Sequence, residues 1–273
     1  MTAGGDLSVE HLSVRYGGVA ALDDVSLRVP RGGVLGLIGP NGAGKTSLIN
    51  AVTGVIRPYA GSIALGALRL ERLPQHRVAR AGVVRTYQNI RLFAALSVAD
   101  NVRAGALRQP GDLDEAAVRA LLERAGVPDA DLRGRAGALP YGAQRRLEIA
   151  RALAGKPAVV LLDEPAAGMN PRETGELRAV IRSLAASGAG VVLVEHDMGL
   201  VSAVCDRVVV LNFGRVIAEG TPAQVARDPE VIEAYLGSPA DNVNGSSAVD
   251  STASAAEKSN ESASANSNGS SEA

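Results

Sequence analysis

The chain has 273 residues, 46% of them apolar, and a formal net charge of −1. This length and apolar content suffice for one large domain or two small ones around a substantial core. The balanced charge exerts no long-range attraction on nucleic acid, and five Tyr, two Phe and no Trp leave few rings for base stacking. We therefore expect no nucleic-acid partner.

Cysteine usage and apolar runs limit where the protein can work. Cys205 is the single cysteine, so no disulfide can form within the chain, which fits a reducing compartment. Residues 1–10 have neither the basic nor the apolar stretch of a signal peptide. The longest apolar runs, such as 158–162, are far shorter than the roughly 20 residues of a membrane helix. We expect a soluble, cytoplasmic protein that reaches a membrane only through a partner.

In chain order, short β-branched runs alternate with helical patterns up to about Gly237. This alternation favours a parallel α/β core, interrupted by a helical segment at about 90–155. The predicted strands are Leu7–Val14 and Ala20–Val29 (on either side of a turn at 16–18), Val34–Ile38, Val159–Leu162 and Val191–Val194, and the predicted helices are Thr46–Val52, Gln109–Val127 and Arg145–Ala154.

The composition changes at Ser238. Residues 238–273 are rich in Ser, Ala and Asn and carry five acidic residues and one lysine. Such a segment cannot bury enough apolar surface to offset the entropy lost on ordering. We expect a folded domain at 1–237 and a disordered tail at 238–273, with an acidic interaction tail as the alternative.

The strongest motif is GPNGAGKT at 39–46, which fits G-x-x-x-x-G-K-[ST] between a predicted strand and a predicted helix. Glycines let consecutive backbone N–H groups face a phosphate, and the following helix directs its positive end at the same anion. The motif predicts a P-loop for a nucleoside triphosphate with Mg²⁺, Lys45 meeting the β- and γ-phosphates and Thr46 the metal. The candidate binding residues are Gly39, Pro40, Asn41, Gly42, Ala43, Gly44, Lys45, Thr46 and Ser47.

A second motif is the apolar run ending in Asp163-Glu164-Pro165. A strand of a P-loop sheet delivers such a carboxylate to the phosphate end, where Asp163 can hold the water shell of the metal. Glu164 is placed to act as general base on the attacking water. Adjacent acids at a strand end are often only solvated, so the functional interpretation depends on the P-loop upstream.

Further segments follow in a fixed order: RTYQN with Gln88, LPYGAQRRLEIARAL at 139–153, AAGMNP with Asn170, VEHDM with His196, and VIEAYLG at 231–237. This set resembles the nucleotide-binding subunits of ABC transporters over Leu7–Gly237. The closer resemblance is to the paired ATPase subunits of branched-chain amino acid importers. It implies an α/β P-loop NTPase core with a parallel sheet, an N-terminal antiparallel β subdomain and an inserted helical signature subdomain.

The resemblance also implies roles that the residues alone do not show. Tyr16 falls where such subunits stack a ring on adenine; otherwise it is a half-buried strand tyrosine. Gln88 falls at the glutamine that senses the metal and the γ-phosphate, and His196 at the histidine that contacts the γ-phosphate. Without the resemblance, Gln88 is a surface residue and His196 a structural histidine. His11 and His76 match nothing and are expected on the surface, and Cys205 is expected in the core.

The signature segment departs from the family pattern L-S-G-G-Q. Pro140 stands where the serine would donate to the γ-phosphate in the opposite subunit, and proline has no donor. Gly142 is retained, so its N–H can contact that nucleotide in trans. Asn170 replaces the usual aspartate. We expect a competent P-loop site but question what this signature contributes to the partner's site.

The resemblance implies a second ABC ATPase subunit, forming a heterodimer rather than a homodimer, and integral-membrane permease subunits. It also implies an extracytoplasmic solute-binding protein and a place on the cytoplasmic face of the membrane. The predicted function is an ATPase with ATP and Mg²⁺, driving import of branched-chain amino acids. The alternatives are a related amide or urea importer, a non-transport ABC protein, and a P-loop kinase or GTPase.

Overall fold

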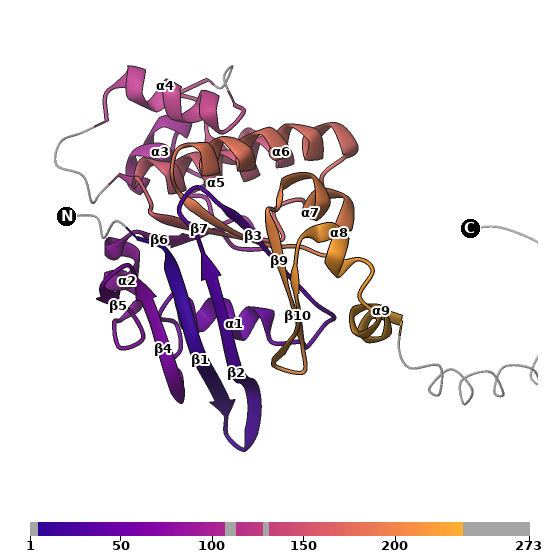
Figure 1. Cartoon of the computed structure of the whole chain (residues 1–273). Helices are drawn as coiled ribbons and strands as arrows, with labels where there is room; N and C mark the ends of the chain where they lie inside the picture. The colour runs from indigo at the N-terminus through magenta and orange to yellow at the C-terminus, as the bar shows by residue number, and fades with distance from the viewer. Residues whose placement is uncertain (1–4, 107–112, 128–130, 237–273) are drawn as a thin grey trace, which may run out of the picture. The chain divides into compact units, whose positions relative to one another are not determined.

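The computed structural model describes residues 5–106, 113–127 and 131–236 (Figure 1). The predicted tail at 238–273 lies outside these residues, as do residues 109–112 of the predicted helix 109–127. The description concerns the unit Met1–Tyr235; of the second unit, Leu236–Ala273, only Leu236 is described.

The first sheet is antiparallel and has the order β2-β1-β4-β5. Its strands are β1 (Leu7–Tyr16), β2 (Val19–Val29), β4 (Ala60–Leu65) and β5 (Leu68–Arg69). In β1, Leu7 and Val9 are buried, and after a bulge the buried positions resume at Leu12 and Val14. The bulge, with His11 at a φ of 51°, inserts the residue that keeps both pairs on the core face. The two predicted strands are confirmed and form an antiparallel hairpin, but the turn predicted at 16–18 is confined to Gly17 and Gly18, because Tyr16 ends β1.

The second sheet has six strands in the order β10-β9-β3-β8-β7-β6. These are β3 (Val34–Ile38), β6 (Val83–Arg85), β7 (Val159–Asp163), β8 (Gly190–Val194), β9 (Arg207–Asn212) and β10 (Arg215–Gly220). The strands from β9 to β6 are parallel, and β10 runs antiparallel to β9. Both β3 and β8 are buried along their whole length, which explains their continuous apolar sequence. The α/β fold with a parallel and an antiparallel sheet is thus confirmed, although β6, β9 and β10 were not predicted.

The parallel sheet separates two apolar cores. One lies between the two sheets and includes helix α1 (Lys45–Val52) and Val78 of α2 (Gln75–Ala81). The other covers the opposite face with α6 (Pro171–Ala186) and α7 (Met198–Val204). Two short helices, α8 (Pro222–Val225) and α9 (Pro229–Leu236), follow β10.

Helices α3 (Val98–Gly105), α4 (Glu115–Arg124) and α5 (Tyr141–Ala154) share a third core and lie together at the top of Figure 1, with the short 3-10 turn η1 (Ala136–Ala138) before α5. Helix α5 belongs to two cores: Leu147 and Ala150 face α3 and α4, whereas Ile149 and Leu153 face the parallel sheet. The helical segment is therefore packed against the sheet that carries the phosphate loop.

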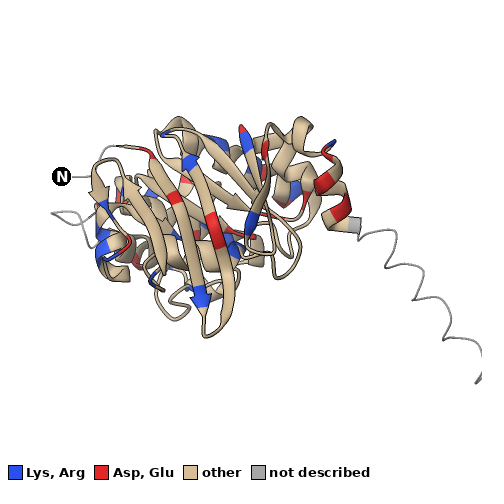
Figure 2. Ribbon diagram, turned by 60° about the horizontal axis from the view of Figure 1, so that its bottom comes forward, with Lys and Arg blue, Asp and Glu red and all other residues tan. Residues whose placement is uncertain are grey.

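Basic and acidic residues are interspersed along the ribbon of the strands and helices (Figure 2). Within the described part of the chain, none of the helices is long and apolar enough to cross a membrane.

Candidate nucleotide site

Four parallel strands bring the predicted motifs to one edge of the sheet. The phosphate loop follows β3, Gln88 follows β6, Glu164 follows β7 and His196 follows β8. Strand β8 lies between β3 and β7, with Val194 opposite both Leu37 and Asp163. Because the carboxyl ends of parallel strands share an edge, segments far apart in the sequence meet there.

The phosphate loop is held by close backbone contacts. A Cβ at Gly39, whose φ is 145°, would lie 2.1 Å from the Leu211 carbonyl oxygen, so no other residue fits there. Lys45 Nζ donates to the carbonyl oxygens of Gly39 (2.5 Å) and Pro40 (2.9 Å). Burial lowers the pKa of Lys45, and the nearby Glu164 and Asp163 carboxylates oppose this shift. The Lys45 ammonium therefore bridges two backbone carbonyl groups of the phosphate loop.

A cavity of about 450 Å³ lies over this loop. Asn41 to Ser47 line it together with Glu164, so eight of the predicted site residues share one cavity. Gly39 and Pro40 do not line the cavity, but their backbone carbonyl groups accept hydrogen bonds from Lys45. Tyr16, 48% exposed at the end of β1, is not among the lining residues, although Val19 of the same hairpin is. The other residues that line the cavity were not predicted from the sequence; they are Val19, Ala20, Ala21, Phe213 and Gly214.

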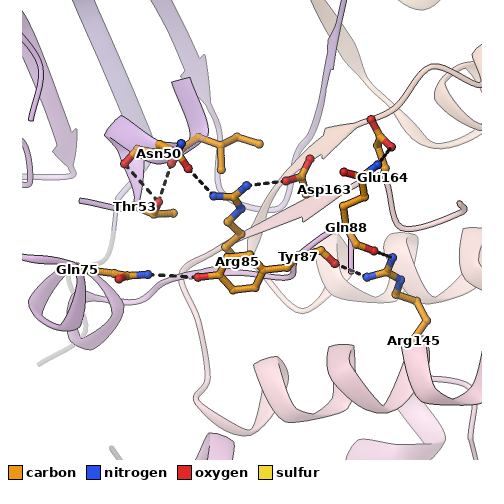
Figure 3. Close-up of polar contacts among 10 residues, drawn as sticks. Asn50, Thr53, Gln75, Arg85, Tyr87, Gln88, Arg145, Asp163 and Glu164 are labelled. Atoms are coloured by element: carbon orange, nitrogen blue, oxygen red, sulfur yellow. Dashed lines mark hydrogen bonds and ion pairs between the residues drawn. The ribbon is translucent and has the colours of Figure 1, made fainter. Parts of the chain in front are cut away.

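Glu164 has an unusual backbone. Its φ is 45°, in the left-handed region, which costs roughly 1–3 kcal/mol for such a residue and is typical of functional positions. Its N–H donates to the Val194 carbonyl (2.9 Å), and its carboxylate accepts from Gln88 Nε2 (2.8 Å). Two residues predicted separately, Gln88 and Glu164, are therefore in direct contact (Figure 3).

Asp163 contacts a residue that the sequence did not single out. Arg85, the last residue of β6, donates to Asp163 Oδ2 (2.7 Å) and to Asn50 Oδ1 (2.7 Å) of α1 (Figure 3). The sequence offered two signals for this contact. Arg85 is a charged residue at the end of an apolar strand, and Asn50 is an amide within the helix that follows the phosphate loop.

His196 is 71% exposed and follows Glu195, which is only 2% exposed. The Glu195 carboxylate accepts from the backbone N–H groups of Ala166 (3.0 Å) and His196 (3.3 Å). Burial raises the pKa of Glu195. Glu195, which sequence reasoning missed, thus joins the loop after Glu164 to the segment carrying His196.

The signature segment lies against the start of α6. Helix α5 begins at Tyr141, and a Cβ at Gly142 would lie 2.3 Å from Glu173 Oε1. Glu173 forms a capping box with Asn170, which explains why asparagine serves at this position. Gly142 is not among the residues lining the 450 Å³ cavity.

Arg145 connects α5 to the segment that carries Gln88. Its fully buried guanidinium donates to the carbonyl oxygens of Tyr87 and Gln88 (Figure 3). It also pairs with Glu148 (3.1 Å). Arg145 lies 58 and 57 residues from Tyr87 and Gln88 in the sequence, which explains why the sequence did not predict its role.

The remaining expectations concern single residues. Cys205 is buried, which raises its pKa to about 12. His11 is exposed and pairs with Asp24 (2.7 Å), and His76 is exposed as well. Burial raises the pKa of Tyr235 in α9, and a hydrogen bond with the Gly39 backbone opposes this shift.

The donor set fits a hard divalent cation. Thr46 offers a hydroxyl in the cavity, and Asp163 a carboxylate at the same edge of the sheet. Among the described residues, no three His, Cys, Asp or Glu side chains gather into a metal cluster. A magnesium ion here would take further ligands from phosphate oxygens and water.

Known proteins share this arrangement. Residues 22–167 match the ABC transporter family, and residues 215–241 match the branched-chain amino acid ATP-binding cassette transporter family. The chain is 43% identical to the high-affinity branched-chain amino acid transport ATP-binding protein BraF of Pseudomonas aeruginosa, over 85% of this chain and 97% of that protein. It is also 43% identical to LivG of Escherichia coli, described in the same words, with the same coverage.

A solved structure agrees. The ADP conformation of an ATP-binding cassette of an ABC transporter superposes with a TM-score of 0.78 at 28% identity, over 86% of this chain and 99% of that chain. The chain therefore belongs to the ABC transporter family, as one of its ATP-hydrolysing subunits.

Proposed function

We propose that the chain hydrolyses ATP at the cavity over residues 41–47, with Glu164 as general base, to energise a branched-chain amino acid importer. One observation carries the chemical part: Glu164 shares the cavity with the phosphate loop, and Gln88 holds its carboxylate.

The chemistry is an in-line attack of water on the γ-phosphate. Glu164 accepts the proton of that water, while Gln88 orients the carboxylate. Lys45 leaves the loop carbonyls to meet the phosphates, and with His196 it stabilises the charge on the transferring group. Thr46, Asp163 and Gln88 would hold magnesium, which neutralises phosphate charge when bound. Tyr16 would stack on the adenine from the β1–β2 hairpin.

A second ATPase subunit would complete the site. Gly142 is buried against Glu173 and does not line the cavity of its own chain, so its N–H would serve a nucleotide held by another subunit only after the Glu173 side chain moves. Binding of ATP would close such a sandwich and hydrolysis would open it. The sister ATPase would be a different chain, as in paired importer subunits.

The transport part rests on the relatives. BraF and LivG are branched-chain amino acid transport proteins by name, and residues 215–241 match the corresponding family. The chain would sit on the cytoplasmic face of the membrane, bound to permease subunits that receive solute from an extracytoplasmic binding protein. An amide or urea importer is the alternative solute class.

Uptake of labelled leucine in a strain lacking this gene tests the proposal. The unaltered chain should restore uptake, whereas Lys45→Ala, which removes the phosphate contact, should not. Restored uptake of urea but not of leucine would overturn the proposed solute. The chain should also co-purify with an integral membrane protein, and stable association with ribosomes or DNA would contradict a transport role.

A further inference from the structure

Arg85 makes an ion pair with Asp163 at the inner side of the nucleotide site. Arg85 Nη2 lies 2.7 Å from Asp163 Oδ2, and the two side chains are only 10% and 13% exposed. At such burial a charged pair is hardly screened by solvent, and loss of one partner leaves the other uncompensated. The pair is therefore a fixed part of the site.

The arginine is itself held on three sides. Its Nη1 donates to Asn50 Oδ1 (2.7 Å), and its guanidinium lies over the Tyr87 ring, 4.9 Å from the centroid. Tyr87 in turn accepts a hydrogen bond from Gln75 Nε2 (3.2 Å) on α2 (Figure 3). The planar guanidinium is thus fixed at both Nη atoms and on its face, which directs Nη2 at one place. Its buried Nε has no hydrogen-bond partner among the described residues.

This geometry occupies one oxygen of the Asp163 carboxylate. Oδ2 accepts from Arg85, and Oδ1 carries no hydrogen bond within the described residues. A carboxylate fixed through one oxygen presents the other in a defined direction, as do the outer partners of metal ligands in general. Asn50 is five residues beyond Lys45 on α1, so the same arginine also ties this carboxylate to the helix after the phosphate loop.

We propose that Arg85 is a positioning residue for the metal site: it holds Asp163 through Oδ2 so that Oδ1 faces the magnesium ion of the bound nucleotide. This inference rests on the proposed role of Asp163 toward that metal. Arg85 touches neither the nucleotide nor the metal and acts through the carboxylate alone.

Two other roles of the Arg85–Asp163 pair predict a different change in metal affinity. If the guanidinium competed with the metal for Asp163, removing it would strengthen metal binding. If the pair were only structural, removal would lower the free energy of unfolding and leave metal affinity unchanged. A positioning role predicts weaker metal binding, because the carboxylate loses its fixed orientation.

The experiment measures Mn²⁺ binding in the presence of ADP, from the free Mn²⁺ signal in electron paramagnetic resonance, for the full chain. Arg85→Met should weaken Mn²⁺ binding about 10- to 100-fold, the usual cost of losing an outer partner of a metal ligand. Metal-free ADP binding should stay unchanged. Arg85→Lys, which can reach only one of the two acceptors, should fall between.

Two further variants keep the test decisive. Arg182→Met, which breaks the exposed pair with Asp206 (3.0 Å), is the matched control and should bind Mn²⁺ normally. Should Arg85→Met fail to fold, Asn50→Ala, which releases the other end of the guanidinium, should weaken Mn²⁺ binding in the same direction but less. Unchanged or tighter Mn²⁺ binding in the folded variants would overturn the inference.

Asp163→Asn separates this failure from failure of the proposed function. If Asp163→Asn loses Mn²⁺ affinity and the Arg85 variants do not, the metal role of Asp163 stands and only the positioning role of Arg85 falls. If Asp163→Asn itself binds Mn²⁺ normally, the proposed metal site is wrong.

Discussion

The phosphate loop and the signature segment differ in how they relate to the cavity of their own chain. Residues 41–47 line it directly and offer backbone N–H groups and a lysine. Gly142, at the start of α5, instead packs against Glu173 and contributes nothing to that cavity. Both have a glycine at the start of a helix, where backbone N–H groups suit phosphate, but only the phosphate loop lines a cavity of its own chain.

Buried polar contacts join the two regions. Arg145 of α5 holds the carbonyl oxygens of Tyr87 and Gln88, and the Gln88 side chain holds Glu164. The signature helix thus supports this site through Arg145 in its interior, and under the proposed function its N-terminus would serve another subunit.

The largest effect should come from breaking the connection at Arg145. Arg145→Met leaves Glu148 as a buried carboxylate with fewer partners, which costs about 3–5 kcal/mol in the free energy of unfolding. It also releases the Gln88 backbone, so hydrolysis per folded molecule should fall. Urea unfolding and steady-state hydrolysis measure the two effects.

Arg119→Met is the control for Arg145→Met, because Arg119 pairs with Glu115 (2.9 Å) on the exposed surface. Its loss should change the free energy of unfolding by less than about 1 kcal/mol. Arg145→Met with unaltered stability and rate would show that α5 does not support the Gln88 segment.

The second effect concerns the signature glycine. Gly142→Ala places a methyl group 2.3 Å from Glu173 Oε1, the end of a flexible side chain, so Glu173 should move and give up its capping hydrogen bond from the Asn170 N–H. The loss of this cap, about 0.5–2 kcal/mol in the free energy of unfolding, should offset the gain that alanine brings in a helix. The matched control is Gly175→Ala on α6, where a Cβ meets nothing within 4 Å. This variant should raise the free energy of unfolding by up to about 1 kcal/mol. Thermal unfolding of both variants checks this, and equal shifts would contradict the packing of Gly142 against Glu173.

The smallest effect should be a pH dependence from Glu195. Because burial raises its pKa in the folded state, this state holds the proton more tightly than the unfolded chain. The stability that this gives is present at pH below the ordinary glutamate pKa and is lost as pH rises through the folded pKa. Ala166 and His196 donate to different oxygens of Glu195, so Glu195→Gln keeps an acceptor for only one of these two N–H groups. Because the variant has no charge to bury, its stability relative to the unaltered protein should still rise as pH increases through that window.

Urea unfolding at several pH values measures the effect of Glu195→Gln. Parallel stability curves for the two proteins would show that Glu195 does not carry a raised pKa.

What the sequence could predict depended on how local the feature is. The phosphate loop is one continuous segment with its own strand and helix, and β7 delivers Asp163 and Glu164 directly, so both were found from spacing. Arg85, Asn50, Arg145 and Glu195 act through contacts with distant segments, and such pairing has no period or spacing in the sequence. The bulge at His11 and the edge strand β6 escaped for a similar reason, because pairing with neighbouring strands determines them.

The most direct test of the account is steady-state ATP hydrolysis by Glu164→Gln, alongside binding of Mg-ATP. Glutamine keeps the shape of the side chain and an acceptor for Gln88 but cannot take a proton, so the variant should bind Mg-ATP and hydrolyse it roughly 10²–10⁴-fold more slowly. Glu219→Gln, in the exposed pair with Arg207, is the matched control and should hydrolyse normally. Unimpaired hydrolysis by Glu164→Gln would remove Glu164 as the general base and contradict the account.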